Sequence, residues 1–354
     1  MVKGYTPLSR GCDQRSCYPA TGNLLIGRQD KLTRYCVLSL LDNTSPSNSR
    51  QNCFWCDSSK EGTYDNPRTS HNINNIVYRM GRDRGGNSFP TWWQARNGDE
   101  YVTIQLNLEA EFHVTHLIMT FKTFRPAAMY IEKSYDWGTT WNIHRYFAAD
   151  CESSFPGISM GVPRYLNDTV CQSRYSRQIP STKGSVIYRV LPSNVNIRSP
   201  GFNPYSEEVQ TLLKTTNLRI HMTRLHTLGK YYYSIYDMTI RGSCSCYGHA
   251  ERCTPFNEEY ANIPGMVHGK CDCTHNTKGN NCEFCMDNYN DVPWRPATGK
   301  RRMNVKNAIV TIMPAAVFSI PLSMPLLVKI ASIIPRDTTV NPALLDTTKI
   351  PIWT

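Results

Sequence analysis

The spacing of cysteines at 244–285 constrains this chain more than any other feature of its 354 residues. Seven of the fourteen cysteines lie there, as two Cys-x-Cys pairs, two single cysteines and a last one that completes a Cys-x-x-Cys pair. Apolar residues are too few in this stretch to build a hydrophobic core, so covalent links must replace one. Each disulfide stabilises a fold by about 2–4 kcal/mol. We therefore predict a small crosslinked module of the kind found outside the cytosol.

Zinc is the alternative, because thiolates and the imidazoles of His249, His268 and His275 occur in the same stretch. Structural zinc sites favour Cys-x-x-Cys pairs. Only Cys53/Cys56 and Cys282/Cys285 have that spacing, and they lie far apart in the sequence. We favour disulfides, with zinc as the second interpretation.

The middle of the chain alternates between apolar and polar side chains with a period of two, which is typical of half-buried strands. We predict strands at 101–108, 112–124, 185–191, 217–225 and 231–242. No long amphipathic pattern indicates a helix between them. Many short strands with irregular connections predict an all-β chain, built as an antiparallel sandwich of the jelly-roll type.

Composition and charge limit the function. The chain is 40% hydrophobic and 19% charged, so it can bury a core, and its net charge of +11 is spread along the sequence. Such a charge favours acidic partners such as sulfated glycans and does not by itself indicate nucleic-acid binding. The sequence lacks the serine-hydrolase, zinc-protease, P-loop and dinucleotide motifs. We therefore predict that it is not an enzyme and requires no cofactor.

The two ends of the chain differ from the rest. Residues 1–7 lack the apolar core that a signal peptide needs. Residues 308–334 are almost wholly apolar, and ~20 such residues can span a bilayer. Three prolines at 314, 321 and 325 would break a helix there. We expect a disordered or non-native tail at 301–354 and no membrane span.

The cysteine-rich stretch resembles a known repeat. Its strings GSCSCYGHAERC at 242–253, GMVHGKCDCTHNTKGNNCEFC at 265–285 and PWRP at 293–296 are similar to the first laminin-type EGF-like repeat. The resemblance implies a disulfide-rich EGF-like module at 244–300 that lacks its eighth cysteine. A non-homologous apolar tail at 301–354 would follow it.

The preceding residues resemble the laminin N-terminal domain. The run at 122–129, together with 265–269, is more similar to a laminin β chain than to an α or γ chain. The resemblance implies a jelly-roll β-sandwich over 11–243, in agreement with the predicted strands. The strings that carry it are SCYPATGNLLIGR at 16–28, WWQARNG at 92–98, IQLNLEAEF at 104–112, HLIMTFKTFRPAAM at 116–129 and YYY at 231–233.

The resemblance also implies a pairing of the cysteines. Relative to the family, a short segment just before Cys36 is missing, which leaves Cys56 without a partner. Cys285 lacks the eighth cysteine of its repeat. Seven cysteines in the N-terminal domain also require one that is left over. The implied pairs are Cys12–Cys17, Cys36–Cys53, Cys151–Cys171, Cys244–Cys253, Cys246–Cys271 and Cys273–Cys282.

Two kinds of modification or ligand site are predicted at the surface. Asn43 and Asn167 begin glycosylation sequons in turn-like surroundings. Asp83 and Thr91 have the spacing of the calcium ligands in some laminin N-terminal domains and netrins, and hard oxygen ligands suit calcium. Tyr236 stands where those proteins have a serine ligand, so a solvated turn around Asp83 is the alternative.

The function that the resemblance implies is structural. A laminin β-chain N-terminal arm would be secreted into the extracellular matrix, bind the N-terminal domains of laminin α and γ chains, polymerise in basement membranes and support cell adhesion. Heparan sulfate and cell-surface receptors are further expected partners, and a netrin-like guidance ligand is the alternative. We predict part of the interaction patch at Trp92, Gln94, Asn97, Asp99 and Glu100, unless Trp92 and Trp93 belong to the core.

Overall fold

The computed structural model describes residues 16–37, 71–77, 80–82, 85–96, 98–192, 206–226, 231–290 and 292–297. The chain divides into two units, Met1–Ala308 and Ile309–Thr354, and every described residue belongs to the first. The tail predicted at 301–354 thus lies outside the described residues. In the described part, no helix is both long and apolar enough to cross a membrane.

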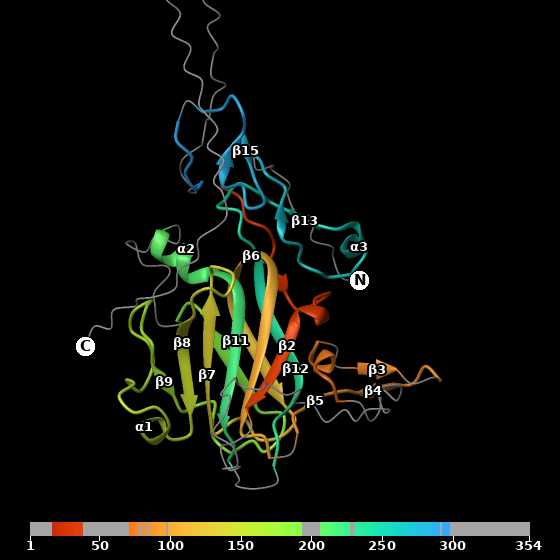
Figure 1. The fold of residues 1–354 in the computed structure, drawn as a ribbon, viewed down its shortest axis with the longest axis vertical. Helices are drawn as coiled ribbons and strands as arrows, with labels where there is room; N and C mark the ends of the chain where they lie inside the picture. The colour runs from red at the N-terminus through yellow and green to blue at the C-terminus, as the bar shows by residue number, and fades with distance from the viewer. Residues whose placement is uncertain are drawn as a thin grey trace, which may run out of the picture. The chain divides into compact units, whose positions relative to one another are not determined.

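The longest strand, β6 (Tyr101–Phe121), organises the sandwich (Figure 1). Its first half pairs with β2 (Leu32–Val37) and β11 (Lys214–Arg224). Its second half pairs with β12 (Ser234–Cys244) and β10 (Ser185–Arg189). Because its two halves have different neighbours, β6 belongs to two sets of strands and connects them.

The strands predicted at 101–108 and 112–124 are therefore one strand, and the predicted break is wrong. Ala110 is buried, whereas Glu109 and Glu111 on either side of it face away from the core. Each of these carboxylates has a cationic partner, Arg28 for Glu109 and Lys214 for Glu111. Two paired glutamates thus continue the alternation between the two predicted strands.

Two further groups of strands extend the sheet from β11 and β12. From β11 it continues through β7 (Ala128–Ser134) and β8 (Asn142–Ala148) to β9 (Cys171–Gln172), the last pair being parallel. On the other side, β12 pairs with β1 (Gly22–Asn23) and β5 (Trp93–Gln94). The remaining elements of the sandwich are the hairpin β3 (Met80–Arg82) and β4 (Ser88–Pro90), the 3-10 helices η2 (Gln29–Lys31) and η3 (Ile73–Ile76), and the helices α1 (Cys151–Ser154) and α2 (Glu207–Leu213).

The core follows from the alternation along β6. Even-numbered residues from Val102 to Val114 are buried, and odd-numbered residues are buried from Leu117 to Phe121. The change occurs at a β-bulge, where β12 pairs Arg241 with His116 and the next residue, Gly242, with Val114. One extra residue in a strand reverses which side chains face the core, so both halves of β6 bury an apolar face.

The cysteine-rich module continues directly from the sandwich, because β12 ends at Cys244. The module contains short elements only: β13 (Cys253–Thr254), α3 (Glu258–Ala261), β14 (Lys270–Cys271), β15 (Thr277–Lys278) and β16 (Phe284–Cys285). The prediction of an all-β sandwich followed by a disulfide-rich EGF-like module is confirmed.

Candidate interaction site

Trp92 lies just before β5 and is half-buried. Its ring stacks on that of His71 with the centroids 4.2 Å apart, and the Lys122 Nζ lies 4.4 Å from its centroid. The indole Nε1 donates a hydrogen bond to Gln94 Oε1 at 3.2 Å. Side chains from two other segments, with Gln94 two residues along the chain, thus hold this tryptophan at the surface in one orientation.

His71 and Lys122 set the charge of the cluster of side chains around Trp92, which we call the Trp92 cluster. Burial lowers the pKa of His71, and the nearby Lys122 ammonium lowers it further. Protonation of His71 would place two cations against one indole, so the cluster favours a neutral imidazole. A cation over an indole face contributes about 0.5–2 kcal/mol, and Lys122 has this position.

Trp93 has a different environment from Trp92. It is fully buried in the core, and it pairs with Ile235 of β12. Successive residues of a strand point to opposite faces, which explains why two adjacent tryptophans separate. The core interpretation thus holds for Trp93, whereas Trp92 remains at the surface.

The turn after β5 is fixed by the main chain of Tyr231 and the side chain of Tyr233. The N–H of Gly98 donates to the carbonyl oxygen of Tyr231 at 2.8 Å, and the Tyr233 hydroxyl donates to that of Glu100 at 2.7 Å. Gly98 has φ +91°, a conformation that favours glycine. Asp99 is half-buried, which raises its pKa. Asn97 lies outside the described residues.

The predicted calcium site is only partly described, because Asp83 lies outside the described residues. Thr91 is buried. Tyr236, at the position of the expected serine ligand, packs its ring edge-on against Trp92 with centroids 6.5 Å apart. A ring in this position does not supply the small hydroxyl ligand that the family has there. The calcium site at Asp83 and Thr91 stays a prediction.

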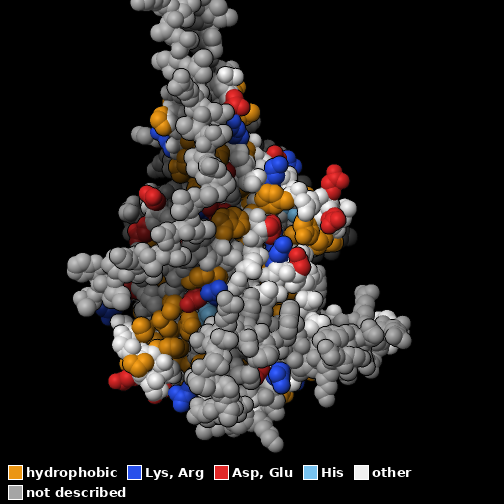
Figure 2. Space-filling view, viewed as in Figure 1, with side chains coloured by type: hydrophobic (Ala, Val, Ile, Leu, Met, Phe, Trp, Pro, Cys, Tyr) orange, Lys and Arg blue, Asp and Glu red, His pale blue; other side chains and the backbone are white. Residues whose placement is uncertain are grey.

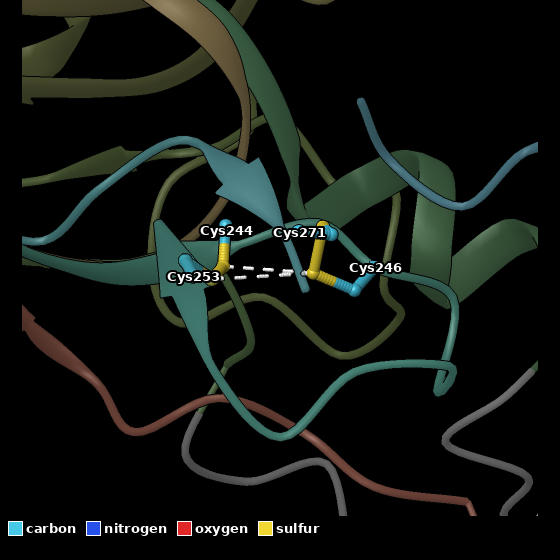
Figure 3. A group of neighbouring side chains, drawn as sticks. All are labelled: Cys244, Cys246, Cys253 and Cys271. Carbon is cyan, nitrogen blue, oxygen red and sulfur yellow. Dashed lines mark hydrogen bonds between the residues drawn. A yellow bond between two sulfur atoms is a disulfide. The ribbon is translucent and has the colours of Figure 1, made fainter. Parts of the chain in front are cut away.

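Four disulfides are present among the described cysteines, and Figure 3 shows two of them. Their Cα–Cα separations of 5.5–6.6 Å lie in the usual range for disulfides. A sulfur atom in a disulfide is not a thiolate and cannot bind zinc in its place. The bonded pairs are Cys151–Cys171, Cys244–Cys253, Cys246–Cys271 and Cys273–Cys282.

The other predicted cysteine and sequon sites are described only in part. Cys17 is disulfide-bonded, and the Cys285 thiol is free and half-buried. Asn167 is exposed, and its amide donates to Glu208 Oε1 at 2.9 Å. Its glycosylation stays a prediction. The predicted sites whose side chains lie outside the described residues are Cys12, Cys36, Cys53, Cys56 and Asn43.

A polar cluster that sequence reasoning missed joins the sandwich to the module. We call Glu111, His113, Lys214, Ser245 and Asn281 the junction cluster. Ser245 Oγ donates to Glu111 Oε1 at 2.8 Å and lies 3.0 Å from His113 Nε2. Lys214 Nζ lies 3.0 Å from Glu111 Oε2, and Asn281 Nδ2 donates to the Ser245 carbonyl oxygen at 2.7 Å. Burial, with the nearby lysines, lowers the pKa of His113 to about 4, so this histidine is neutral.

Arg28 makes a second link between the sandwich and the module. Its guanidinium is almost fully buried, with 1% of the side chain exposed. It donates to both carboxylate oxygens of Glu109 on β6 and, at 2.6 Å, to the carbonyl oxygen of Val267 in the module. Glu109 and Glu111 fall in a break between two predicted strands, so no signal in the sequence indicates this junction. Nothing local to Arg28 indicates its partners either.

Comparison with known families decides the assignment of both parts. The family described as Laminin N-terminal (Domain VI) matches residues 17–242, and the laminin EGF domain matches residues 244–299. The chain belongs to the laminin N-terminal family. The junction cluster and Arg28 therefore connect a laminin N-terminal domain to a laminin EGF domain.

Individual relatives agree with this family and with the predicted resemblance to laminin β chains, which is confirmed. Laminin subunit beta-1 of Drosophila melanogaster is 52% identical over 82% of this chain, and laminin subunit beta-2 of Homo sapiens is 50% identical over 81%. Netrin-4 of Pongo abelii is 36% identical over 84%. The chain spans 17%, 16% and 48% of the lengths of these three relatives, respectively.

One solved structure is weakly similar to this chain. A chitosan-binding module from a Paenibacillus chitosanase/glucanase has 15% identity and a TM-score of 0.28, covering 52% of this chain and 90% of that chain.

Proposed function

We propose that this chain is the N-terminal arm of a laminin β-type chain, an extracellular structural protein and not an enzyme. In this proposal its sandwich, at 11–243, binds the N-terminal domains of laminin α and γ chains in basement membranes. The EGF-like module at 244–300 carries the sandwich, and polymer assembly supports cell adhesion. The 50–52% identity to laminin β chains, against 36% to netrin-4, favours this function over a netrin-like one.

The observation that carries the proposal is the rigid connection between the two domains. Arg28 and the junction cluster tie β6 to the module without a linker, because β12 ends at Cys244. A rigid domain loses less conformational entropy when it binds, so several weak contacts suffice at each point where three N-terminal domains meet (a node). Many linked nodes then add avidity to the polymer.

The Trp92 cluster supports a contact within such a node. A half-buried tryptophan suits an interface, because tryptophan is frequent among the residues that dominate binding energy, and Lys122 holds its ring by a cation–π contact. The cluster is already held by His71 and Gln94, so little order is lost on binding. We therefore propose Trp92 as an anchor for a partner domain.

Size-exclusion chromatography with light scattering tests the function. The secreted chain is mixed with N-terminal fragments of laminin α and γ chains, and a ternary complex is expected. Trp92→Ala should weaken it, whereas Trp137→Ala, at a tryptophan that is 61% exposed elsewhere on the sandwich, should not. Tight binding to a netrin receptor without a ternary complex would contradict the proposal.

A further inference from the structure

A cavity of about 480 Å³ opens at the edge of the sandwich between β8 and β10. Its walls come from these two strands, from β9 and from the loops around them. Figure 2 shows one face of the molecule, where hydrophobic side chains gather over the part of the sheet around β7 and β8 with charged groups among them. The residues that carry the argument are Arg145, Gln172, Arg174, Tyr175, Tyr188 and Arg189.

Arg145 is buried in this cavity and has no counter-ion in the part of the chain that the structure describes. It is 5% exposed, and its Nη1 has no hydrogen-bond partner among the described residues. Among the described residues no carboxylate lies within ion-pair distance of it. Asp168, the acidic group that acts on it electrostatically, accepts the N–H groups of Arg164 and Tyr165 at 2.7 and 2.9 Å instead. A buried cation without a partner is costly, so the site is incomplete as it stands.

The phenol of Tyr188 is a second buried polar group in this cavity. It is 2% exposed, and its hydroxyl has no hydrogen-bond partner among the described residues. Tyr188 and Arg145 line the same cavity. Both groups can donate hydrogen bonds, and a guanidinium cannot accept one. The group that would satisfy both is an acceptor with a negative charge.

The rim of the cavity is also positively charged. Arg174 and Arg189 are exposed there, and the described lining residues include three arginines and no acidic residue. Arginines bind oxyanions with short, charge-assisted hydrogen bonds. We propose that this cavity binds a sulfate group carried on a sugar ring.

The size and the remaining lining favour a sulfated sugar over a bare anion. Small-molecule sites occupy about 300–1,000 Å³, so the cavity holds a ring beside the anionic group. Gln172 and Ser173 supply polar side chains for ring hydroxyls, and Tyr175 supplies an aromatic face. The three terminal oxygens of a sulfate ester match several donors from different directions better than the two oxygens of a carboxylate. The choice of sulfate over phosphate rests on the proposed extracellular function.

Isothermal titration calorimetry of the secreted chain in about 0.15 M salt tests this site. The probes are a sulfated heparin hexasaccharide, the same sugar without sulfate groups, inorganic sulfate, inorganic phosphate and a poly-glutamate peptide. The sulfated sugar should bind, and inorganic sulfate should compete with it. Arg145→Met should weaken binding by about tenfold or more, as expected for the loss of a charge-assisted hydrogen bond.

Two further variants test the site without changing the buried Arg145, whose substitution could disturb folding. The double variant Arg174→Gln/Arg189→Gln changes exposed side chains only and should also lose affinity, whereas Arg177→Gln, an exposed arginine outside the lining, should not. Unchanged binding by both lining variants would overturn the proposal, as would equal binding of the desulfated sugar, the peptide or phosphate. This assay contains no laminin α or γ fragments. A negative result would therefore overturn the sulfated-sugar site without affecting the proposed assembly with α and γ chains, which has its own test.

Discussion

Arg28 Nε donates a hydrogen bond to Glu109 Oε2 at 2.7 Å, and the same guanidinium reaches the carbonyl oxygen of Val267 in the neighbouring module. The pair is buried on the arginine side and partly exposed on the glutamate side, with 1% and 21% of the side chains exposed. Because one guanidinium connects β6 to the module, this ion pair fixes the geometry of the junction.

We expect Arg28→Met to lower the free energy of unfolding by about 2–4 kcal/mol, because it removes one partner of a largely buried ion pair. Chemical denaturation of the secreted chain measures this. Arg252→Met is the control, since the Arg252–Asp272 pair is exposed at 80% and 52% and such pairs contribute about 0–1 kcal/mol. Equal effects of the two variants would show that Arg28 does not stabilise the junction.

The second prediction concerns the close approach of Gly269 to β6. A Cβ atom on Gly269 would lie 2.6 Å from the Cβ of Ala110 and 2.9 Å from Phe256. Gly269→Ala should therefore cost about 1–3 kcal/mol by overpacking. The same denaturation experiment on Gly269→Ala/Ala110→Gly should recover part of this loss. A double variant as unstable as the sum of the two single variants would exclude the contact.

Acid should destabilise the fold through His113. Its pKa is lowered from 6.5 to about 4 in the folded state, so the unfolded chain binds a proton first as the pH falls. Stability is thus fully present above pH 6.5 and decreases toward pH 4, by about 3 kcal/mol for this group. Calorimetry of His113→Gln should show a weaker pH dependence over this range. A pH dependence identical to that of the unmodified chain would contradict the assignment.

Alkali should act in the opposite sense through Lys133. Its side chain is buried and donates to the carbonyl oxygen of Leu212 at the end of α2, and burial lowers its pKa from 10.5 to about 7. The unfolded chain binds more protons between these two values, so stability should rise from pH 7 to 8.5, by about 2 kcal/mol. Lys133→Met should abolish this rise in a thermal unfolding series, and Lys122→Met should retain it. A rise in stability that persists in Lys133→Met would refute this role of Lys133.

The sequence predicted the class of fold well, because alternation and cysteine spacing are local signals. It missed β8, where Arg145 occupies a buried position and obscures the alternation. The prediction also divided β6 at Glu109. Two glutamates, Glu109 and Glu111, are tolerated in this strand because each pairs with a cation that is distant in the chain. Trp92 was found as an exposed candidate, but His71, Lys122 and Tyr236 around it come together only through strand pairing.

Peptide mapping of the natively secreted protein by mass spectrometry, without reduction, tests the central claim most directly. A laminin-type extracellular arm requires the crosslinks Cys244–Cys253, Cys246–Cys271 and Cys273–Cys282, with the Cys285 thiol open to alkylation. We expect those three crosslinked peptide pairs and an alkylated Cys285. Reduced thiols at Cys244, Cys246, Cys253 and Cys271, or zinc bound between them, would contradict the account.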